Sequence, residues 1–231
     1  MNYTDAHCHI CPALPAPTEL AGRICCTTRE AEWDEFVTTA NTKTHICVGI
    51  HPWYIANINP NWETHMRQIL SNNQSVMVGE IGLDKYHNDM PTQIEIFTRQ
   101  IEIAAEFHRA IQLHCVGAWD TVMRILTGCG RNLPPAIIAH AFGGHPQIIN
   151  KLAIEYNMYF SYQTPKNDKT RARIAQTPLD RLLIETDTTT PGQEIDNLTE
   201  TIRQISHILG QSTQDIQNKI YTNFQKVISN V

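Results

Sequence analysis

The chain has 231 residues, of which 42% are hydrophobic, and this much apolar material can bury a large core, which excludes a disordered protein. The 23 acidic residues outnumber the 18 basic ones and give a formal charge of −5, which argues against a protein that holds nucleic acid mainly through a positive surface. A phosphate-bearing substrate therefore needs a local positive charge, which bound divalent cations can supply.

Eight short apolar runs predict β-strands, and nearly every run is followed by a segment with helical periodicity. The predicted strands cover residues 3–9, 23–28, 45–50, 76–81, 110–115, 136–141, 158–163 and 182–186. The clearest predicted helices are 91–110, which opens with Pro91, and 212–229, which follows Gly210 and begins at the capping residue Ser212.

No linker or repeat interrupts this alternation, so we expect one domain over residues 1–231. Eight successive βα units predict an α/β fold, the TIM (β/α)8 barrel, and an open doubly wound sheet is the alternative. The sequence has no run long enough to cross a bilayer and no secretory leader, which predicts a cytoplasmic protein that does not bind a membrane. A monomer is the simplest expectation.

The first predicted strand contains Asp5, His7 and His9 at alternate positions. Successive side chains of a strand point to opposite faces, so this spacing places the carboxylate and both imidazoles on one face. Cys8 falls on the other face, which argues against a redox or zinc pair of Cys8 and Cys11. The seven cysteines have no framework spacing and are interpreted as reduced, buried thiols.

Ionisable residues also stand at the ends of five other predicted strands: His51, Glu80, His114, His140 and Asp187. The C-terminal strand ends form the active-site face of a barrel. Burying such groups without partners costs several kcal/mol apiece, a penalty that divalent metals remove. Four imidazoles and two carboxylates are enough ligands for two ions, and Glu80 can bridge them.

The segments "DAHCHI", "GIHPW", "GEIGLDKYH", "LHCVGA", "IIAHAFGG" and "LLIETD" together resemble the TatD-like metal-dependent hydrolases, from residue 5 to about residue 225. That family has a TIM-barrel fold of the amidohydrolase type and is associated with metal-dependent DNase activity. The resemblance implies that His7, His9 and Asp187 bind one metal, that Glu80 is shared, and that His114 and His140 bind the second metal. It also places His51 beside the site, facing the substrate, and gives Asp5 a supporting role behind the first-strand ligands.

Three positions depart from the family pattern. Val116 stands where the family commonly has an arginine, Ala141 replaces a cysteine, and after Asp187 the usual Ala-Pro becomes "TTTP", which moves proline to residue 191. The predicted metal ligands are thus present, whereas the substrate pocket is altered.

These features predict a metal-dependent hydrolase that acts on ester bonds, a deoxyribonuclease whose attacking water is activated by two divalent ions, Mg, Mn or Zn. Asp187 orients that water and accepts its proton, and Glu80 and His51 complete the expected catalytic set. The expected partner is DNA, single-stranded or at an exposed end. Two alternatives are hydrolysis of a small amide, lactone or ester, favoured by Val116, and a metal-binding barrel without catalysis.

Two further groups of residues could contact nucleic acid. Trp53, Tyr54 and Tyr86 follow predicted strand ends, where they would stack on an unpaired base or pack the barrel mouth. A basic cluster follows the seventh strand, where it would track a nucleic-acid backbone or form a solvated helical turn; its members are Lys166, Lys169, Arg171 and Arg173.

Overall fold

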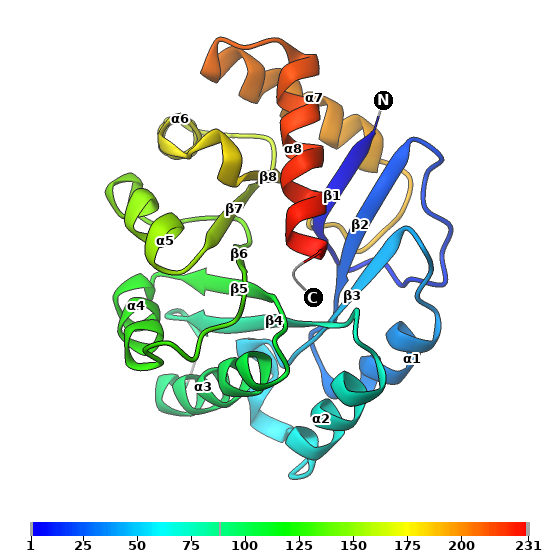
Figure 1. Cartoon of the computed structure of the whole chain (residues 1–231), viewed down its shortest axis with the longest axis vertical. Helices are drawn as coiled ribbons and strands as arrows, with labels where there is room; N and C mark the ends of the chain where they lie inside the picture. The colour runs from blue at the N-terminus through cyan, green and yellow to red at the C-terminus, as the bar shows by residue number, and fades with distance from the viewer. Residues whose placement is uncertain (1, 88, 230–231) are drawn as a thin grey trace.

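The computed structural model describes residues 2–87 and 89–229, in which eight strands form one parallel sheet in sequential order (Figure 1). The strands are β1 (Tyr3–Cys8), β2 (Leu20–Cys26), β3 (Thr44–Val48), β4 (Met77–Asp84), β5 (Ile111–Val116), β6 (Ile137–Ala139), β7 (Met158–Tyr162) and β8 (Leu182–Ile184). An open doubly wound sheet would reverse its strand order at a switch point. The sequential order therefore confirms the predicted TIM barrel.

Two backbone hydrogen bonds join the first strand to the segment after the last. The Asp187 N–H donates to the His7 carbonyl at 2.9 Å, and the His9 N–H donates to the Thr188 carbonyl at 2.8 Å. These bonds form at the C-terminal ends of β1 and β8. They close the ring and bring residues about 180 positions apart in sequence to one end of the barrel.

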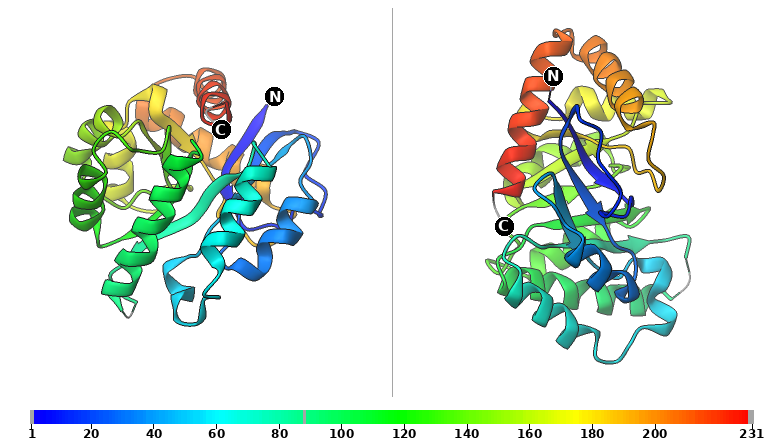
Figure 2. Two further views of the ribbon diagram at one scale, coloured as in Figure 1. Left: turned by 60° about the horizontal axis from the view of Figure 1, so that its bottom comes forward. Right: turned by 90° about the vertical axis from the view of Figure 1, so that its right-hand side faces the viewer.

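The surrounding helices are α1 (Trp33–Thr38), α2 (Trp62–Asn72), α3 (Met90–Glu106), α4 (Trp119–Gly128), α5 (Ile149–Glu155), α6 (Asp168–Gln176), α7 (Glu194–Leu209) and α8 (Thr213–Ile228). Ser212 caps α8 as predicted, because its Oγ accepts the Asp215 N–H at 3.1 Å. Gly210, with φ of 62°, ends α7. The C-terminal α8 packs against β1 and β8 (Figures 1 and 2).

The connection between β1 and β2 contains no helix, although residues 9–19 are all described. Its sequence contains Pro12, Pro15 and Pro17, which remove backbone donors and prevent a continuous helix. This segment instead contains turns and leads into β2 at Leu20, three residues before the predicted start. Two helices, α7 and α8, follow β8.

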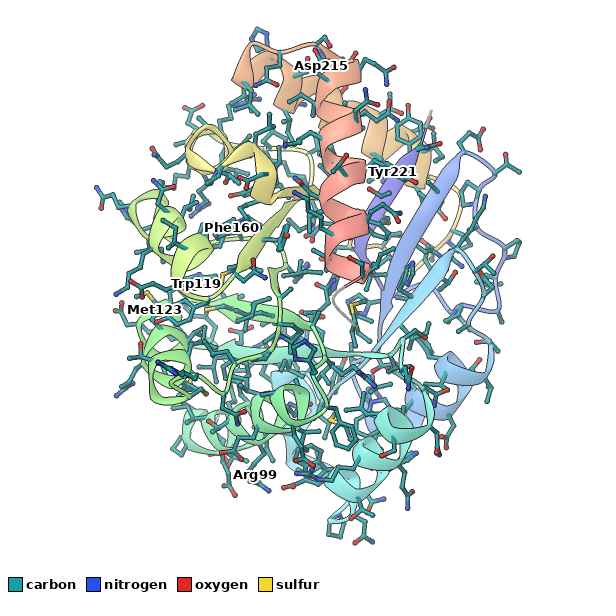
Figure 3. All side chains as sticks on the ribbon, in the orientation of Figure 1. Arg99, Trp119, Met123, Phe160, Asp215 and Tyr221 are labelled. Carbon is teal, nitrogen blue, oxygen red and sulfur yellow. The ribbon has the colours of Figure 1, made fainter. Side chains whose placement is uncertain are left out.

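The outer helices contact each other through charged side chains. Arg99 of α3 lies at the periphery of the molecule and pairs with Glu63 of α2 at 2.8 Å (Figure 3). Such exposed pairs contribute little to stability. None of the helices within residues 2–87 and 89–229 combines the length and the hydropathy that crossing a bilayer requires.

Candidate metal centre

Glu80 of β4 lies at the centre of the residues that the strand ends bring together. The carboxylate is buried, and its Oε2 atom lies 3.4 Å from His7 Nε2 and 3.3 Å from His9 Nε2. Its other oxygen, Oε1, lies 2.7 Å from His114 Nδ1 and 3.7 Å from His140 Nε2. One carboxylate thus faces all four predicted histidine ligands.

Asp187 approaches the same cluster from the segment after β8. Its Oδ1 lies 3.5 Å from His9 Nε2 and 3.8 Å from His7 Nε2, and its Oδ2 lies 3.9 Å from His140 Nε2. Gln163 donates from Nε2 to the same Oδ2 at 3.1 Å, which fixes the orientation of the carboxylate. All six predicted ligands therefore converge on one end of the barrel.

The histidine rings are oriented by contacts behind the cluster. His7 Nδ1 lies 3.2 Å from Gln112 Oε1, and His9 Nδ1 lies 2.9 Å from the Cys26 carbonyl. These acceptors bind the Nδ1 protons, so Nε2 is the atom that each neutral ring can offer to a metal.

His140 has a similar arrangement, with Nδ1 2.9 Å from Glu185 Oε1. The same oxygen accepts the Ala141 N–H at 2.9 Å, and Glu185 is itself buried. A buried carboxylate behind a histidine orients the ring and raises its basicity. The donor set and its supporting contacts fit divalent cations.

The charges of the cluster balance one another. Burial raises the pKa of Glu80, but the charges of His7 and His140 and the hydrogen bond from His114 outweigh it, so the pKa lies well below its ordinary value. Burial also raises the pKa of Asp187. The hydrogen bond from His9 and the charges of His140 and His7 outweigh burial, so the pKa of Asp187 lies below its ordinary value. Both carboxylates are therefore ionised at neutral pH, as metal ligands must be.

Two imidazoles of the cluster have raised pKa values. Burial lowers the pKa of His9, but hydrogen bonds to Asp187 and Glu80 raise it to about 10. For His140, the charges of Glu185 and Glu80 overcome burial and raise the pKa to about 9. Without a bound cation, both rings are therefore positively charged at neutral pH, with protons on both nitrogens, and a bound cation would displace the second proton of each ring.

His51 lies in the same cluster, but its ring is oriented differently. Its Nε2 is 3.4 Å from Glu80 Oε1, so His51, Glu80 and His114 are also close enough to share an ion. However, His51 Nδ1 accepts the Trp53 N–H at 3.2 Å, so the proton of the neutral ring is on Nε2. Burial lowers the pKa of His51 and keeps the ring neutral. This arrangement is that of a hydrogen-bond donor rather than a ligand.

Asp5 lies behind the cluster and ties β1 to the segment after β8. Its Oδ1 accepts the N–H groups of His7 at 3.3 Å and Thr186 at 3.0 Å, and its Oδ2 accepts the Thr186 hydroxyl at 2.6 Å. The carboxylate therefore holds the backbone on both sides of the barrel closure. This position fits the supporting role expected from the sequence.

Gly82 permits the close approach of β4 to β5 beside the cluster. It pairs with His114 and has φ of 153°. A Cβ atom at this position would lie 1.8 Å from the His114 carbonyl oxygen. The glycine in the "GEIGLD" segment thus allows Glu80 and His114 to lie side by side.

The cluster forms the floor of a pocket of about 590 Å³. Trp53 and Tyr54 line this pocket, whereas Tyr86 does not and is 80% exposed. The indole N–H of Trp53 donates to Asp84 Oδ2 at 2.8 Å, which anchors the half-exposed ring. Two of the three predicted aromatics therefore border the site.

The basic cluster after β7 does not line this pocket. Arg173 donates to the carbonyl groups of Gly143 at 2.8 Å and Gly144 at 2.7 Å, and Arg171 donates to Gln204 at 3.2 Å. Two of the four basic residues thus bind other parts of the protein. This favours a helical turn over a surface that tracks a nucleic-acid backbone. Cys8 and Cys11, considered from the sequence as a redox or zinc pair, have different partners. Cys8 Sγ lies 3.6 Å from Cys25 Sγ, and Cys11 donates to Glu35.

Comparison of the sequence and the fold with known proteins agrees with the resemblance noted from the sequence motifs. The model of the family described as "TatD related DNase" matches residues 4–229. The metal-dependent hydrolase YabD of Bacillus subtilis is 30% identical over 149 residues, covering 62% of this chain and 58% of YabD. The 3'-5' ssDNA/RNA exonuclease TatD of Erwinia billingiae is 28% identical over 146 residues, covering 60% of this chain and 55% of that protein.

These alignments span little more than half the length of the curated relatives. The crystal structure of YJJV, a TatD homologue from Escherichia coli, superposes with a TM-score of 0.80 over 97% of both chains at 20% identity, and this agreement concerns the fold. Because the family model covers nearly the whole chain, the protein belongs to the TatD-related DNase family of metal-dependent hydrolases.

Proposed function

We propose that this protein is a metal-dependent nuclease that hydrolyses phosphodiester bonds of single-stranded DNA or RNA. The observation that carries the proposal is the convergence of four imidazoles and Asp187 on the two oxygens of Glu80. The Erwinia relative described as a 3'-5' ssDNA/RNA exonuclease supports the choice of substrate.

The proposed ligands are those predicted from the sequence: His7, His9, Glu80, His114, His140 and Asp187. Divalent ions held there would lower the pKa of water and neutralise phosphate charge, which suits Mg, Mn or Zn. The two oxygens of Glu80 face different histidine pairs, so Glu80 would be the ligand shared by the two groups of histidines if ions were held there.

Asp187 and His51 have distinct roles in this proposal. Asp187 is ionised and held by Gln163, so it accepts the proton of the attacking water as the new P–O bond forms. The Nε2–H of His51 donates a hydrogen bond to a phosphate oxygen and stabilises the charge that develops there. The leaving oxygen departs as the second P–O bond breaks and takes a proton from water.

The main alternative is hydrolysis of a small amide, lactone or ester. Val116, the last residue of β5, supports this alternative, because its side chain offers no positive charge to a phosphate. The phosphodiester is favoured because the pocket also contains Arg29 and two aromatic side chains, groups that bind phosphates and bases.

The test is nucleotide release from a short single-stranded DNA and an RNA of the same sequence. Chelator-treated protein should be inactive and regain release with Mg, Mn or Zn, whereas His9→Asn should not. His207→Asn is the matched control, because His207 lies exposed in the last turn of α7, outside the pocket lining, and its loss should leave release unchanged. Turnover of small carboxyl esters without nucleotide release would refute the nuclease and favour the alternative.

A further inference from the structure

One wall of the pocket carries a cation that the metal cluster does not account for. Of the described side chains that line the pocket, Arg29 is the only lysine or arginine. It follows β2 and shares the pocket with His9, His51 and Glu80. An anionic substrate entering the pocket would therefore meet Arg29 as well as the metal ligands.

The guanidinium group of Arg29 is held by an aromatic ring. Its Cζ atom lies 4.0 Å from the centroid of Tyr54, which belongs to the 3-10 helix η2 (Pro52–Asn57) directly after His51. A cation over an aromatic face is held by the ring and not through its N–H groups. The contact thus orders the group while its hydrogen-bond donors stay available.

The carboxylates nearest in sequence are occupied by other partners. Glu30 Oε1 accepts hydrogen bonds from His65 at 2.9 Å and from Asn59 at 3.3 Å. Glu32 Oε2 accepts the backbone N–H of Thr28 at 2.7 Å. Within residues 2–87 and 89–229, no ion pair or side-chain hydrogen bond uses the Arg29 guanidinium.

These observations describe an ordered, uncompensated guanidinium at the side of a pocket in a protein of net charge −5. The group is exposed at the pocket wall, where an anion that enters the pocket can reach it. The planar fork of arginine matches two oxygens of a phosphate.

We propose that Arg29, held on Tyr54, is a phosphate-binding subsite for the phosphate next to the scissile one in a single-stranded nucleic acid. This inference rests on the proposed nuclease function. The scissile phosphate lies at Glu80 and His51, and Arg29 binds the adjacent phosphate of the strand along the pocket wall. The subsite makes the protein prefer a strand of at least two phosphates over an isolated phosphodiester.

The experiment removes the positive charge of Arg29 in one variant and the negative charge of the adjacent phosphate in one substrate. One short single-stranded DNA has ordinary linkages, and a second carries a neutral methylphosphonate next to the linkage that is cleaved. On the ordinary strand, Arg29→Ala should lower kcat/KM roughly 10- to 100-fold, the effect of a lost hydrogen bond to a charged group. On the neutral strand most of this loss should disappear, because the partner of Arg29 is already absent.

Two variants complete the comparison. Arg29→Lys keeps the charge but not the planar fork, so its kcat/KM should fall between those of the wild type and Arg29→Ala. Arg131→Ala makes the same change in net charge at an exposed turn before β6, outside the pocket lining, and should match the wild type on both strands.

The outcomes separate the two proposals. If the wild type cleaves and Arg29→Ala is slowed equally on both strands, or on neither, the subsite is refuted and the nuclease stands. If the wild type cleaves no phosphodiester with any metal, the nuclease proposal fails and the subsite fails with it.

Discussion

Glu185 offers a sharp test of how the metal centre is supported, because it contacts a predicted ligand without belonging to the cluster. Its Oε1 atom lies 2.9 Å from His140 Nδ1 and 2.9 Å from the Ala141 nitrogen. We predict that Glu185→Gln folds normally but binds metal more weakly. The amide has the shape of the carboxylate and keeps an acceptor oxygen, so the change removes mainly the charge.

The size of the effect follows from these contacts. A hydrogen bond to a charged group contributes about 1.5–3 kcal/mol and one between neutral groups about 0.5–1.5 kcal/mol, so the exchange costs about 1–1.5 kcal/mol. That corresponds to roughly tenfold weaker metal binding, at the lower end of the 10- to 100-fold range for such supporting groups. Glu185→Ala leaves the Ala141 N–H without its acceptor and His140 without its ionic partner, and it should also lower the free energy of unfolding by about 1–3 kcal/mol.

The assay is calorimetric titration of chelator-treated protein with zinc or manganese, with thermal unfolding of each variant measured in parallel. Glu200→Gln is the matched control, because Glu200 is exposed on α7 and pairs with Arg203 away from the site. Wild-type metal affinity in Glu185→Gln would refute the reasoning that the buried carboxylate strengthens His140 as a ligand.

Three further predictions follow. Zinc binding at pH 7 should release protons and tighten as pH rises, because His9 and His140, with pKa values of about 10 and about 9, must lose protons first. Titrations in buffers of different ionisation enthalpy measure the number of protons released. Zinc binding without proton release would contradict this prediction. Gly82→Ala should lower stability by about 1–3 kcal/mol and weaken metal binding, since the left-handed backbone is strained and the added Cβ meets β5; an unchanged Tm would contradict this. Trp53→Ala should weaken single-stranded DNA binding roughly tenfold in fluorescence anisotropy, whereas Tyr86→Ala should not, and equal effects of the two changes would exclude Trp53 as the stacking residue.

The barrel could be predicted from the sequence because its strands are short apolar runs at regular intervals. The ends of six of the eight runs also marked where a polar side chain would enter the site, and this located Glu80, His114 and His140 together. The segment before Leu20 was less regular, since three prolines stand where most other strands are followed by a helix.

The supporting contacts could not be predicted in the same way. Gln112 lies two positions before His114 on β5, and a spacing of two on a strand indicates a shared face, whereas Glu185 and Asp187 lie beyond the end of β8. Nothing in the sequence shows which ring each one contacts, because the partners come from β1 and from the segment after β6. The orientation of His51 likewise depends on a backbone N–H, which no side-chain pattern reveals.

The position of Arg29 in the pocket could not be predicted from the sequence, for a related reason. Its charge is one of many on the surface, and only the fold brings it over Tyr54 and into the same pocket as Glu80. The sequence identified Val116 as a position without the expected cation, but it could not indicate where another cation would enter the pocket.

The most direct test of the central claim compares the wild type with Asp187→Asn on a short single-stranded DNA after metal is restored. Asparagine keeps the shape of the side chain but cannot accept the proton of water, so the variant should keep its fold and lose nucleotide release at least about 100-fold. Circular dichroism and metal content should be measured on the same samples. Undiminished release by a folded Asp187→Asn would contradict the proposed mechanism.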